Sequence, residues 1–402
     1  MPWKREGRGM ERLLAKYTNS YLSYVILFFF YDLAFALFSA LISVYLIGKG
    51  YSASQVSLLI SAASLANMVT QPFIGSLTER FGMRPVNMVL FGASCFAGGL
   101  FVIAPNFAII VLAYALMNLI MNGVNPVVER MATSSPYSYG SVRMWGSIGF
   151  SAGTQLTGLL YDNIAPVAPY VAFIFAMLLA ILGFWGTNPR VAETESANIE
   201  ADGEPVSAKD LLTNKKFLYY LVLQVIFAAV TGAAYSFCSV YLTTKGLEAS
   251  TASTVLSIAT LLEIPLLLFS NKFMDKIANK TLLLGIFALV LIEMVIYGLN
   301  MPLPFIIIAT FIGRHPPAII NIMANMKVVN TIVDPRQQIT GLALVKTCQS
   351  FGTIISNNIG GQIADAAGYP AMFLFLCALI GVGLVGVVFF QVPSGNDKKL
   401  FS

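Results

Sequence analysis

The sequence predicts an all-α membrane protein with twelve transmembrane helices, and three observations lead to this fold class. First, 57% of the 402 residues are hydrophobic and only 11% are charged, whereas soluble proteins carry about a quarter of charged residues. Second, the apolar residues are grouped in blocks of about 20, the length of helix that crosses a bilayer. Third, a polar stretch at 188–214 divides these blocks six and six.

The blocks place the spans and the domains along the chain. We expect the spans at about 20–47, 54–79, 85–104, 107–130, 139–160, 167–187, 216–244, 251–273, 281–299, 303–329, 337–364 and 370–392. The predicted domains are an N-terminal tail at 1–19, a six-helix bundle at 20–187, a linker at 188–214, a second bundle at 215–392 and a C-terminal tail at 393–402. Interior Gly and Pro in several spans are compatible with membrane helices.

The basic residues predict how the chain lies in the membrane. Of the 24 Lys and Arg residues, all but four lie in or beside the two tails, the linker and the loops on the same side. Lys49 and Lys245 fall on the opposite side, and Arg314 and Lys346 fall inside spans. The positive-inside rule therefore predicts a multi-pass plasma-membrane protein with both termini in the cytoplasm. The net charge of +5 reflects this topology and does not indicate nucleic-acid binding.

Several function classes leave no trace in the sequence. It shows no nucleotide-binding loop, metal-ligand cluster or nucleophile triad, so we expect no cofactor, no metal and no enzymatic activity. The four cysteines lie in spans without paired spacing and are expected to pack there: Cys95, Cys238, Cys348 and Cys377. The basic N-terminus lacks the short apolar core of a cleavable signal peptide. The energy source for any transport is then an ion gradient or the solute gradient.

An acid and a guanidinium in neighbouring spans are the strongest functional clue. Glu129 ends the segment Asn-Pro-Val-Val-Glu, and Arg143 begins the next span fourteen residues later. A charge inside hydrocarbon costs several kcal/mol, roughly, so such residues usually face a water-filled cavity. Together they can bind a hydroxylated solute, with the guanidinium offering a fixed fork of donors. The alternative is a salt bridge near the short loop between these spans.

Three further ionisable residues within spans are candidates for function. Asp32 is a natural proton carrier, or else an acid held by hydrogen bonds inside the bundle. His315 is the only histidine, with an unperturbed pKa near physiological pH, and it stands before a Pro-Pro pair. Lys346 has no opposite charge within one helical turn, so it needs a cavity or a partner on another helix.

Two acids in the second half have structural and functional interpretations. Glu263 precedes Pro265, where a helix break frees a carbonyl, and it can bind solute or serve only the local structure. Glu293 lies deep in the ninth span and Arg314 lies near the middle of the tenth. They can form a structural pair between helices, or Glu293 can take part in proton coupling.

A repeated motif relates the two halves. Residues 75–84 contain an acid-base pair followed by a further cation, and residues 271–280 repeat this order at the equivalent helix end. The first copy, Gly-x-x-x-Glu-Arg-x-Gly-x-Arg, resembles the signature of the major facilitator superfamily between spans two and three. The resemblance implies two six-helix, pseudo-symmetric halves, with these residues as a conformational latch: Gly75, Glu79, Arg80, Gly82, Arg84, Asp275 and Lys276.

Within that superfamily the chain most resembles the oligosaccharide:proton symporters. The matching segments are Phe-Phe-Phe-Tyr at 28–31, Gln-Pro-Phe-Ile-Gly at 71–75, Asn-Pro-Val-Val-Glu at 125–129 and Arg-Met-Trp-Gly-Ser-Ile-Gly at 143–149. The resemblance implies that Glu129 and Arg143 bind sugar and that Glu263 is a second sugar-contacting acid. Phe150 occupies the position of an aromatic residue that stacks on the sugar, and Phe can stack on an apolar sugar face.

The sequence leaves three functional hypotheses. The first is a secondary transporter that moves a sugar or related hydroxylated solute together with protons, by alternating access and as a monomer in the lipid bilayer. Solute binding is then expected at Glu129, Arg143, Phe150, Glu263 and Lys346, and proton coupling at Asp32, Glu293 and His315. The second is a drug/proton antiporter of the same fold, because Met- and Phe-rich walls suit amphipathic cations. The third is a membrane sensor, for which the linker is too short to be a signalling segment.

Overall fold

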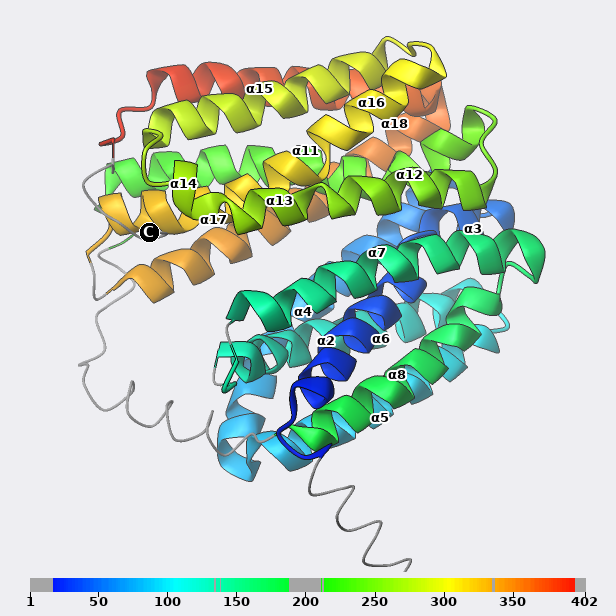
Figure 1. Cartoon of the computed structure of the whole chain (residues 1–402). Coiled ribbons are helices and arrows are strands. Elements are labelled where there is room, and N and C mark those ends of the chain that lie inside the picture. The colour runs from blue at the N-terminus through cyan, green and yellow to red at the C-terminus, as the bar shows by residue number, and fades with distance from the viewer. Residues whose placement is uncertain are drawn as a thin grey trace, which may run out of the picture. The chain divides into compact units, whose positions relative to one another are not determined.

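The computed structural model describes residues 17–133, 135–137, 139–187, 211, 213–334 and 337–394, and every regular element within them is a helix (Figure 1). These residues form two compact units. The first unit comprises Met1–Ala40 and Val69–Asp202, and the second comprises Leu41–Met68 and Gly203–Ser402. Most of the two predicted tails and of the predicted linker lies outside the described residues.

The first unit contains five complete helices. They are α2 (Tyr21–Ser39), α5 (Met83–Val102), α6 (Phe107–Thr133), α7 (Tyr139–Asn163) and α8 (Ala168–Gly186). Helix α4 (Ala53–Phe81) belongs to this unit only from Val69 onward. The Ser20 side chain caps α2 by accepting a hydrogen bond from the Ser23 backbone N–H, which satisfies one of the donors that a helix leaves open at its N-terminus.

Small residues on α7 let it lie directly on the backbone of α2. A methyl group at Gly149 would overlap the backbone carbonyl of Phe29, and one at Gly153 would overlap that of Leu33. Lipid tails are as apolar as the side chains of a membrane helix, so the hydrophobic effect does not bring such helices together. Close backbone packing at small residues stabilises their association instead. The α2–α7 contact therefore holds these helices in one register.

An aromatic cluster fills the centre of the first unit. The Phe38 ring of α2 lies 4.9 Å from Phe101, 5.7 Å from Tyr114, 5.3 Å from Tyr170 and 5.0 Å from Phe173. All five side chains are buried. Because these rings come from α2, α5, α6 and α8, their edge and face contacts hold four helices together.

The second unit contains the remaining helices. They are α3 (Ile42–Gly48), α11 (Lys215–Thr244), α12 (Ala249–Leu261), α13 (Glu263–Leu268), α14 (Ser270–Phe273), α15 (Asn279–Gly298), α16 (Leu303–Gly313), α17 (His315–Ile332) and α18 (Gln338–Phe389), with α4 up to Met68. Asn214 caps α11 by accepting from the backbone N–H groups of Lys216 and Phe217. Gly368, at φ 83°, turns α18 between two spans, and only a glycine adopts this conformation readily.

Two predicted spans of the second unit are broken helices. The eighth span is interrupted at Leu262, between α12 and α13, and the tenth at Arg314, between α16 and α17. Pro265, Pro316 and Pro317 follow these breaks, and proline removes a helical hydrogen bond and clashes with the preceding turn. Irregular backbone at membrane depth is tolerated where it lies within protein or lines a cavity.

The repeated motif has the same structural role in each unit. Arg84 donates from Nη2 to the carbonyl of Trp185 at 2.8 Å, and Lys280 donates from Nζ to the carbonyl of Val388 at 2.6 Å. Each acceptor is the last but one residue of its unit's final helix, α8 or α18. A cation at a helix C-terminus satisfies an open carbonyl and the helix dipole. The final cation of each motif therefore stabilises a contact inside its own unit.

The predicted spans agree with the described helices. Each coincides with a helix, or with a broken pair or series of helices, of the described chain. Nine helical stretches among the described residues are long and apolar enough to cross a membrane, and one of them, Thr340–Phe389, has the length of two spans. The more polar α4 and α7 are outside these nine and have 29 and 25 residues, which is sufficient length for a membrane span.

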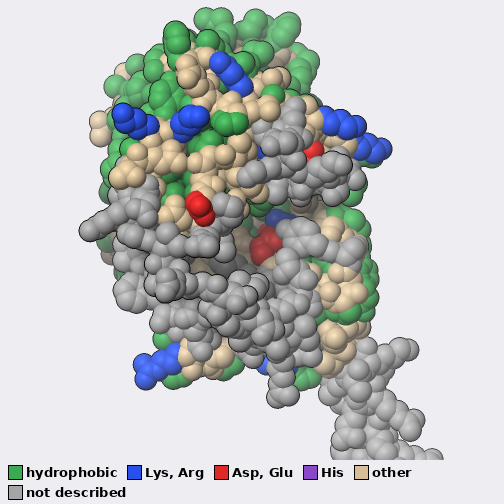
Figure 2. All heavy atoms as spheres, turned by 90° about the vertical axis from the view of Figure 1, so that its left-hand side faces the viewer, with side chains coloured by type: hydrophobic (Ala, Val, Ile, Leu, Met, Phe, Trp, Pro, Cys, Tyr) green, Lys and Arg blue, Asp and Glu red, His purple; other side chains and the backbone are tan. Residues whose placement is uncertain are grey.

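Basic side chains gather at the helix ends on one face. Figure 2 looks at the side on which the described chain ends, where α15 begins and α18 finishes. Among the described residues of the second unit on this face, Lys and Arg side chains are more frequent than Asp and Glu (Figure 2). Such an excess is typical of the cytoplasmic ends of membrane helices.

Asp365 of α18 caps the N-terminus of α4 within the second unit. Its Oδ1 accepts from the Ala53 backbone N–H at 2.7 Å, and its Oδ2 accepts from the Ser54 backbone N–H at 2.9 Å. The first N–H groups of a helix have no partner in the helix and favour a negative charge. A methyl group at Gly361, one turn earlier in α18, would overlap the Ser57 hydroxyl. The two helices therefore meet through a side-chain cap and a close backbone approach.

We expect Asp365→Ala to lower the free energy of unfolding by about 1 kcal/mol, the usual cost of removing an N-capping side chain. Asp365→Asn keeps an acceptor oxygen and should lose about half as much. Unfolding of the purified protein in detergent micelles, followed by circular dichroism, measures the difference. Gln362→Ala, an exposed position on the same helix, is the control and should stay within about 0.5 kcal/mol of the wild type. An alanine variant as stable as this control would contradict the capping role.

Candidate functional site

Arg143 lies between two carboxylates in the first unit. Its Nε is 2.7 Å from Oε1 of Glu129, and its Nη1 is 3.6 Å from Oδ2 of Asp32. The three side chains come from α7, α6 and α2. They retain 32%, 35% and 19% of their exposure in that order, so they are partly accessible. The structure thus joins the predicted acid-guanidinium pair and adds the acid of the first span to it.

Two tyrosines fix the helices that carry this cluster. The Tyr21 hydroxyl of α2 donates to the Ser141 carbonyl at 2.8 Å and accepts from Trp145 Nε1 at 3.0 Å. The start of α7 is therefore tied to the start of α2. The Tyr31 hydroxyl donates to the Met121 carbonyl of α6 at 2.5 Å. Hydrogen bonds therefore connect all three helices that supply the charges.

Gly146 provides the space in which the cluster forms. A methyl group at this position would overlap Oδ2 of Asp32 and Nη1 of Arg143. The glycine lies one turn after Arg143, on the face of α7 that Gly149 and Gly153 continue against α2. The segment Arg-Met-Trp-Gly therefore supplies both Arg143 and, at Gly146, the space in which Arg143 contacts Asp32.

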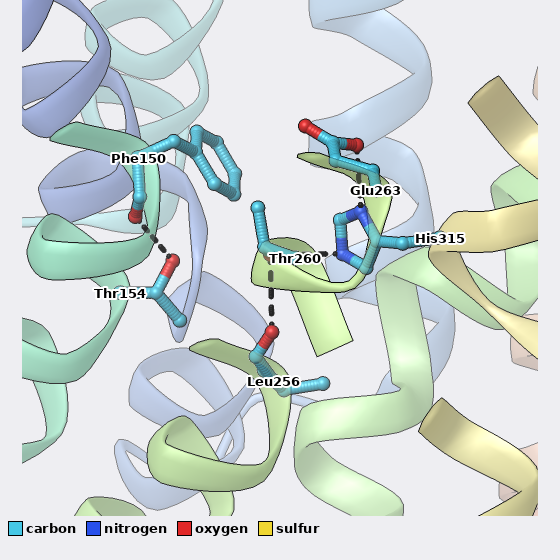
Figure 3. Close-up of polar contacts among 6 residues, drawn as sticks. All are labelled: Phe150, Thr154, Leu256, Thr260, Glu263 and His315. Carbon is cyan, nitrogen blue, oxygen red and sulfur yellow. Dashed lines mark hydrogen bonds and ion pairs between the residues drawn. The ribbon is translucent and has the colours of Figure 1, made fainter. Parts of the chain in front are cut away.

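The Phe150 ring of α7 packs against α2, the helix whose Asp32 also contacts Arg143. Its ring centroid is 6.3 Å from that of Phe35 of α2, at an interplanar angle of 50°. Its carbonyl accepts from the Thr154 hydroxyl at 2.8 Å, as Figure 3 shows. The side chain is half-buried, so part of the ring remains open. Arg143 and Phe150, seven residues apart on α7, both reach α2.

A second cluster forms where the two broken helices of the second unit meet. His315, the first residue of α17, lies with its Nδ1 3.5 Å from Oε2 of Glu263, the first residue of α13. Its Nε2 lies 3.1 Å from the hydroxyl of Thr260 near the end of α12. Thr260 and Glu263 both point toward the imidazole in Figure 3. Breaking each helix turns these three polar groups toward one another.

The hydrogen bonds of this cluster require a proton between His315 and Glu263. The Thr260 hydroxyl lies within hydrogen-bonding distance of the Leu256 carbonyl, at 3.0 Å, and of His315 Nε2, at 3.1 Å, so it can donate its one hydrogen to either of them. A neutral imidazole with its proton on Nε2 presents a lone pair at Nδ1. That lone pair faces a carboxylate oxygen, and two acceptors attract only when a proton lies between them. The contact therefore consists of an Nδ1–H, in a neutral imidazole or an imidazolium, that donates to the carboxylate, or of a carboxylic acid that donates to Nδ1.

Glu293 and Arg314 lie close together without a direct ion pair among the described contacts. Oε2 of Glu293 lies against Gly313, where a methyl group would meet it at 2.8 Å. The Arg314 guanidinium lies 4.2 Å from the Tyr235 ring centroid and donates from Nη2 to the Tyr235 carbonyl at 3.3 Å. Arg314 is thus held mainly by cation–π attraction and a carbonyl, so the simple interhelical pair considered from the sequence is not the arrangement in this structure.

The lysine of the eleventh span and a group of amides form a third polar region. Lys346 on α18 is exposed. Three residues later, Gln349 donates from Nε2 to Oε1 of Gln224 at 2.9 Å. Gln224 and Asn321 donate to each other at 3.2 and 3.1 Å. No feature of the sequence indicated this amide group, because single amides occur in many membrane helices and only the fold brings α11, α17 and α18 together.

A buried lysine holds the repeated motif of the second unit. Nζ of Lys327 donates to the carbonyls of Met274 and Ile277 at 2.8 and 2.7 Å. This turn contains Asp275, which is buried, and Lys276, which is exposed. Lys327 lies near the end of the span expected at 303–329, and no feature of the sequence indicated this role. Its burial among carbonyls stabilises the turn, since a buried ammonium needs hydrogen-bond acceptors.

The latch residues of the first unit are only partly described. Gly75 and Glu79 belong to α4, but their side-chain surroundings lie outside the described residues. Arg80 packs over the Phe81 ring at 5.2 Å. Gly82, at φ 88°, makes the turn between α4 and α5, a conformation that favours glycine. Arg84 caps α8, as described above.

Metal-ligating residues do not gather in the described part of the chain. No group of three or more His, Cys, Asp or Glu side chains there is arranged to hold a metal ion. The four cysteines are free thiols in separate places. The side chains of the two charged clusters offer hydrogen bonding, ion pairing and proton transfer.

Comparison with known proteins places this chain in a family. Residues 21–389 match the MFS_1 like family. The chain belongs to the MFS_1 like family. Maltose permease of Geobacillus stearothermophilus is 22% identical over 383 residues, covering 92% of this chain and 95% of that protein. Quinolone resistance protein NorA of Staphylococcus aureus (strain MRSA252) is 26% identical over 379 residues, covering 89% and 92%.

A solved structure supports the fold of this MFS_1 like protein. A crystal structure of a mutant of the nucleoside transporter NupG superposes with a TM-score of 0.81 at 13% sequence identity, covering 92% of this chain and 99% of that one. The protein is therefore a multi-pass membrane transporter of the major facilitator superfamily that acts on a small molecule, and not an enzyme. The two charged clusters are its candidate sites for solute and proton.

We expect Gly146→Ala to destabilise the protein by about 1–3 kcal/mol, because the added methyl group overpacks the contact between Asp32 and Arg143. Gly140→Ala is the matched control in the same helix, since nothing lies within 4 Å of the added group. It should instead raise the free energy of unfolding, by up to about 1 kcal/mol, because alanine favours helix over glycine. Denaturation of both variants in detergent micelles measures the sign of each change. Equal effects of the two substitutions would contradict a close contact at Gly146.

Proposed function

We propose that this protein is a secondary active transporter that moves a sugar or related hydroxylated solute together with protons, by alternating access. The observation that carries the proposal is the placement of Arg143 between Glu129 and Asp32, at 2.7 and 3.6 Å. The side chains are partly exposed, so a solute can reach them. Vicinal hydroxyl groups can accept from the guanidinium fork and donate to a carboxylate, which is how such a cluster recognises a hydroxylated solute.

The charge of this cluster also favours proton binding. One guanidinium lies beside two carboxylates, so the fully ionised cluster carries a net negative charge. A second negative charge in a partly desolvated site is unfavourable, and one carboxylate of such a group readily takes up a proton. Asp32, at the longer distance from Arg143 and with the lower exposure of the two acids, is the carboxylate that we assign to this role.

The cluster of His315, Glu263 and Thr260 is the second proposed proton site. Its hydrogen bonds need a proton between the imidazole and the carboxylate, as argued above. It is built at two helix breaks, and in transporters discontinuous helices often form the sites for solute and coupling ions. Glu263 can exchange its bond to His315 for a solute hydroxyl, which would connect solute binding to proton release. We assign Glu293 a supporting role in the same unit.

The transport cycle we propose uses the two units as its moving parts. Rocking of two bundles about a central site exposes that site to one side of the membrane at a time. The motif residues around Arg80 and Asp275 would stabilise one of these states. The excess of basic residues at one set of helix ends supports a cytoplasmic location for both termini. We further propose that the protein acts as a monomer in the plasma membrane.

A drug/proton antiporter is the second candidate. The similarity to NorA, a quinolone resistance protein, favours it, as do the open aromatic ring of Phe150 and the many Met and Phe residues of the spans. An antiporter for amphipathic cations needs one accessible acid and apolar walls. The sugar proposal needs the guanidinium as well, so Arg143 distinguishes the two mechanisms.

Counterflow of labelled sugars and cationic dyes in proteoliposomes, with and without a pH gradient, tests the proposal. We expect a sugar-like solute to exchange and to move protons in lightly buffered vesicles. Glu129→Gln and Arg143→Lys should each reduce solute exchange at least about 100-fold, because a charge-assisted fork contact is lost. His315→Gln should retain exchange but lose the accompanying pH change. Lys49→Gln, outside the spans, is the control.

Two outcomes would contradict the symport proposal. Dye transport that survives Arg143→Lys, without exchange of any sugar, would favour the antiporter. Solute movement that depends on sodium and leaves the pH unchanged would replace the proton by another ion.

Phe150 should contribute through its ring face if the solute is a sugar. Phe150→Ala is expected to weaken solute binding about tenfold, since stacking contributes on the order of 1 kcal/mol beyond the buried area. Phe150→Trp keeps a larger ring and should preserve or improve the affinity. Equilibrium binding of the labelled solute to the purified protein measures both variants, with Phe175→Ala as the control at an exposed position. Unchanged sugar affinity in Phe150→Ala, with altered dye transport, would favour the antiporter.

A further inference from the structure

Lys346 is a cation within a membrane span, and the described residues of the second unit provide no counter-ion for it. Its side chain is exposed and takes part in none of the described ion pairs. It lies in α18, inside the apolar stretch Thr340–Phe389. Charges at such positions usually face a water-filled pathway and mark the route of a solute or ion. Lys346 therefore needs an explanation other than structural pairing.

Among the described residues, the helices that pack most closely against α18 supply no carboxylate to this lysine. Helices α11, α15 and α17 pack against α18. The first and third of these contain no acidic residue, and α15 contains only Glu293. That carboxylate lies against Gly313, next to Arg314. In α18 itself the only acid is Asp365, nineteen residues away, and both of its oxygens cap α4.

An amide is held beside Lys346 by a buried hydrogen-bond network. Gln349, three residues later, lies on the same side of the helix, because residues three apart are neighbours on a helix surface. Its Nε2 donates one hydrogen to Oε1 of Gln224, which is fully buried and paired reciprocally with Asn321. This bond fixes the amide so that its second N–H remains to be donated. An ammonium and an amide N–H together form a two-donor site.

We propose that Lys346 and Gln349 bind an acidic group of the transported solute, so that the solute is a hydroxylated carboxylic acid such as a uronic acid. This assignment rests on the proposed function, whose clusters at Arg143 and His315 bind hydroxyl groups and protons. A carboxylate offers two oxygens, one for the ammonium and one for the amide, and charge-assisted hydrogen bonds of this kind are about twice as strong as neutral ones. Moving one such anion with one proton transfers no net charge across the membrane.

Matched neutral and acidic sugars test the assignment. The probes are glucose with glucuronate and galactose with galacturonate, which differ only in a terminal CH2OH or carboxylate. Binding is measured by thermal unfolding of the purified full-length protein in a neutral detergent, and uptake in proteoliposomes of neutral lipid only. The neutral surroundings exclude anionic headgroups, so an effect that appears only after addition of anionic lipid identifies a lipid site and overturns the assignment.

The wild type should bind at least one uronate about tenfold or more tightly than its neutral partner, the difference that one charge-assisted contact gives. Lys346→Gln should remove this preference, Lys346→Arg should keep most of it, and Gln349→Leu should reduce it in part. Lys216→Gln, an exposed lysine at the start of α11, should behave as the wild type.

Three results would overturn the assignment: equal or better binding of the neutral sugars, a uronate preference that survives Lys346→Gln, or no stabilisation by any of the four sugars. These are separable from failure of the proposed function. If a uronate binds through Lys346 but its uptake moves no proton, the assignment stands and the symport proposal fails. If neutral sugars move protons regardless of Lys346→Gln, the symport proposal stands. The Lys346 ammonium then only extends toward water and binds no solute.

Discussion

The high cost of an uncompensated charge inside a membrane is the constraint on which the polar architecture of this protein depends. Arg143 is stabilised by Glu129 and Asp32, and Arg314 by the ring and carbonyl of Tyr235. Each solution requires helices to approach in a particular register, because charged groups tolerate little displacement in a medium without water. The charges therefore both define the candidate sites and restrict how the helices around them can pack.

Small residues and broken helices are the means by which this constraint is met. Gly146 leaves the gap in which Asp32 and Arg143 meet, while the glycines that follow it keep α2 and α7 in contact. In the second unit the interruptions at Leu262 and Arg314 bring Glu263 and His315 together. Helix regularity is given up at the two places where titratable groups meet, and the backbone groups freed there must be satisfied by the protein itself.

The repeat in the chain is visible in structure as well as in sequence. Arg84 and Lys280 occupy equivalent places in their motifs, and each donates to the last but one carbonyl of its unit's final helix. The acid-base pairs that precede them remain assigned to a latch by resemblance. The structure thus accounts for the final cation of each motif, which caps the last helix of its own unit.

The sequence alone predicted the helical membrane fold, the spans and the residues that carry charge within them, because hydropathy and motif spacing are local properties of the chain. It also paired Glu129 with Arg143, which a short loop joins. The addition of Asp32, the contact of His315 with Thr260, the amide network around Gln349 and the burial of Lys327 came only with the tertiary structure. These residues are separated by tens to more than a hundred positions, and side-chain contacts at that separation depend on how whole helices pack, which no local pattern encodes.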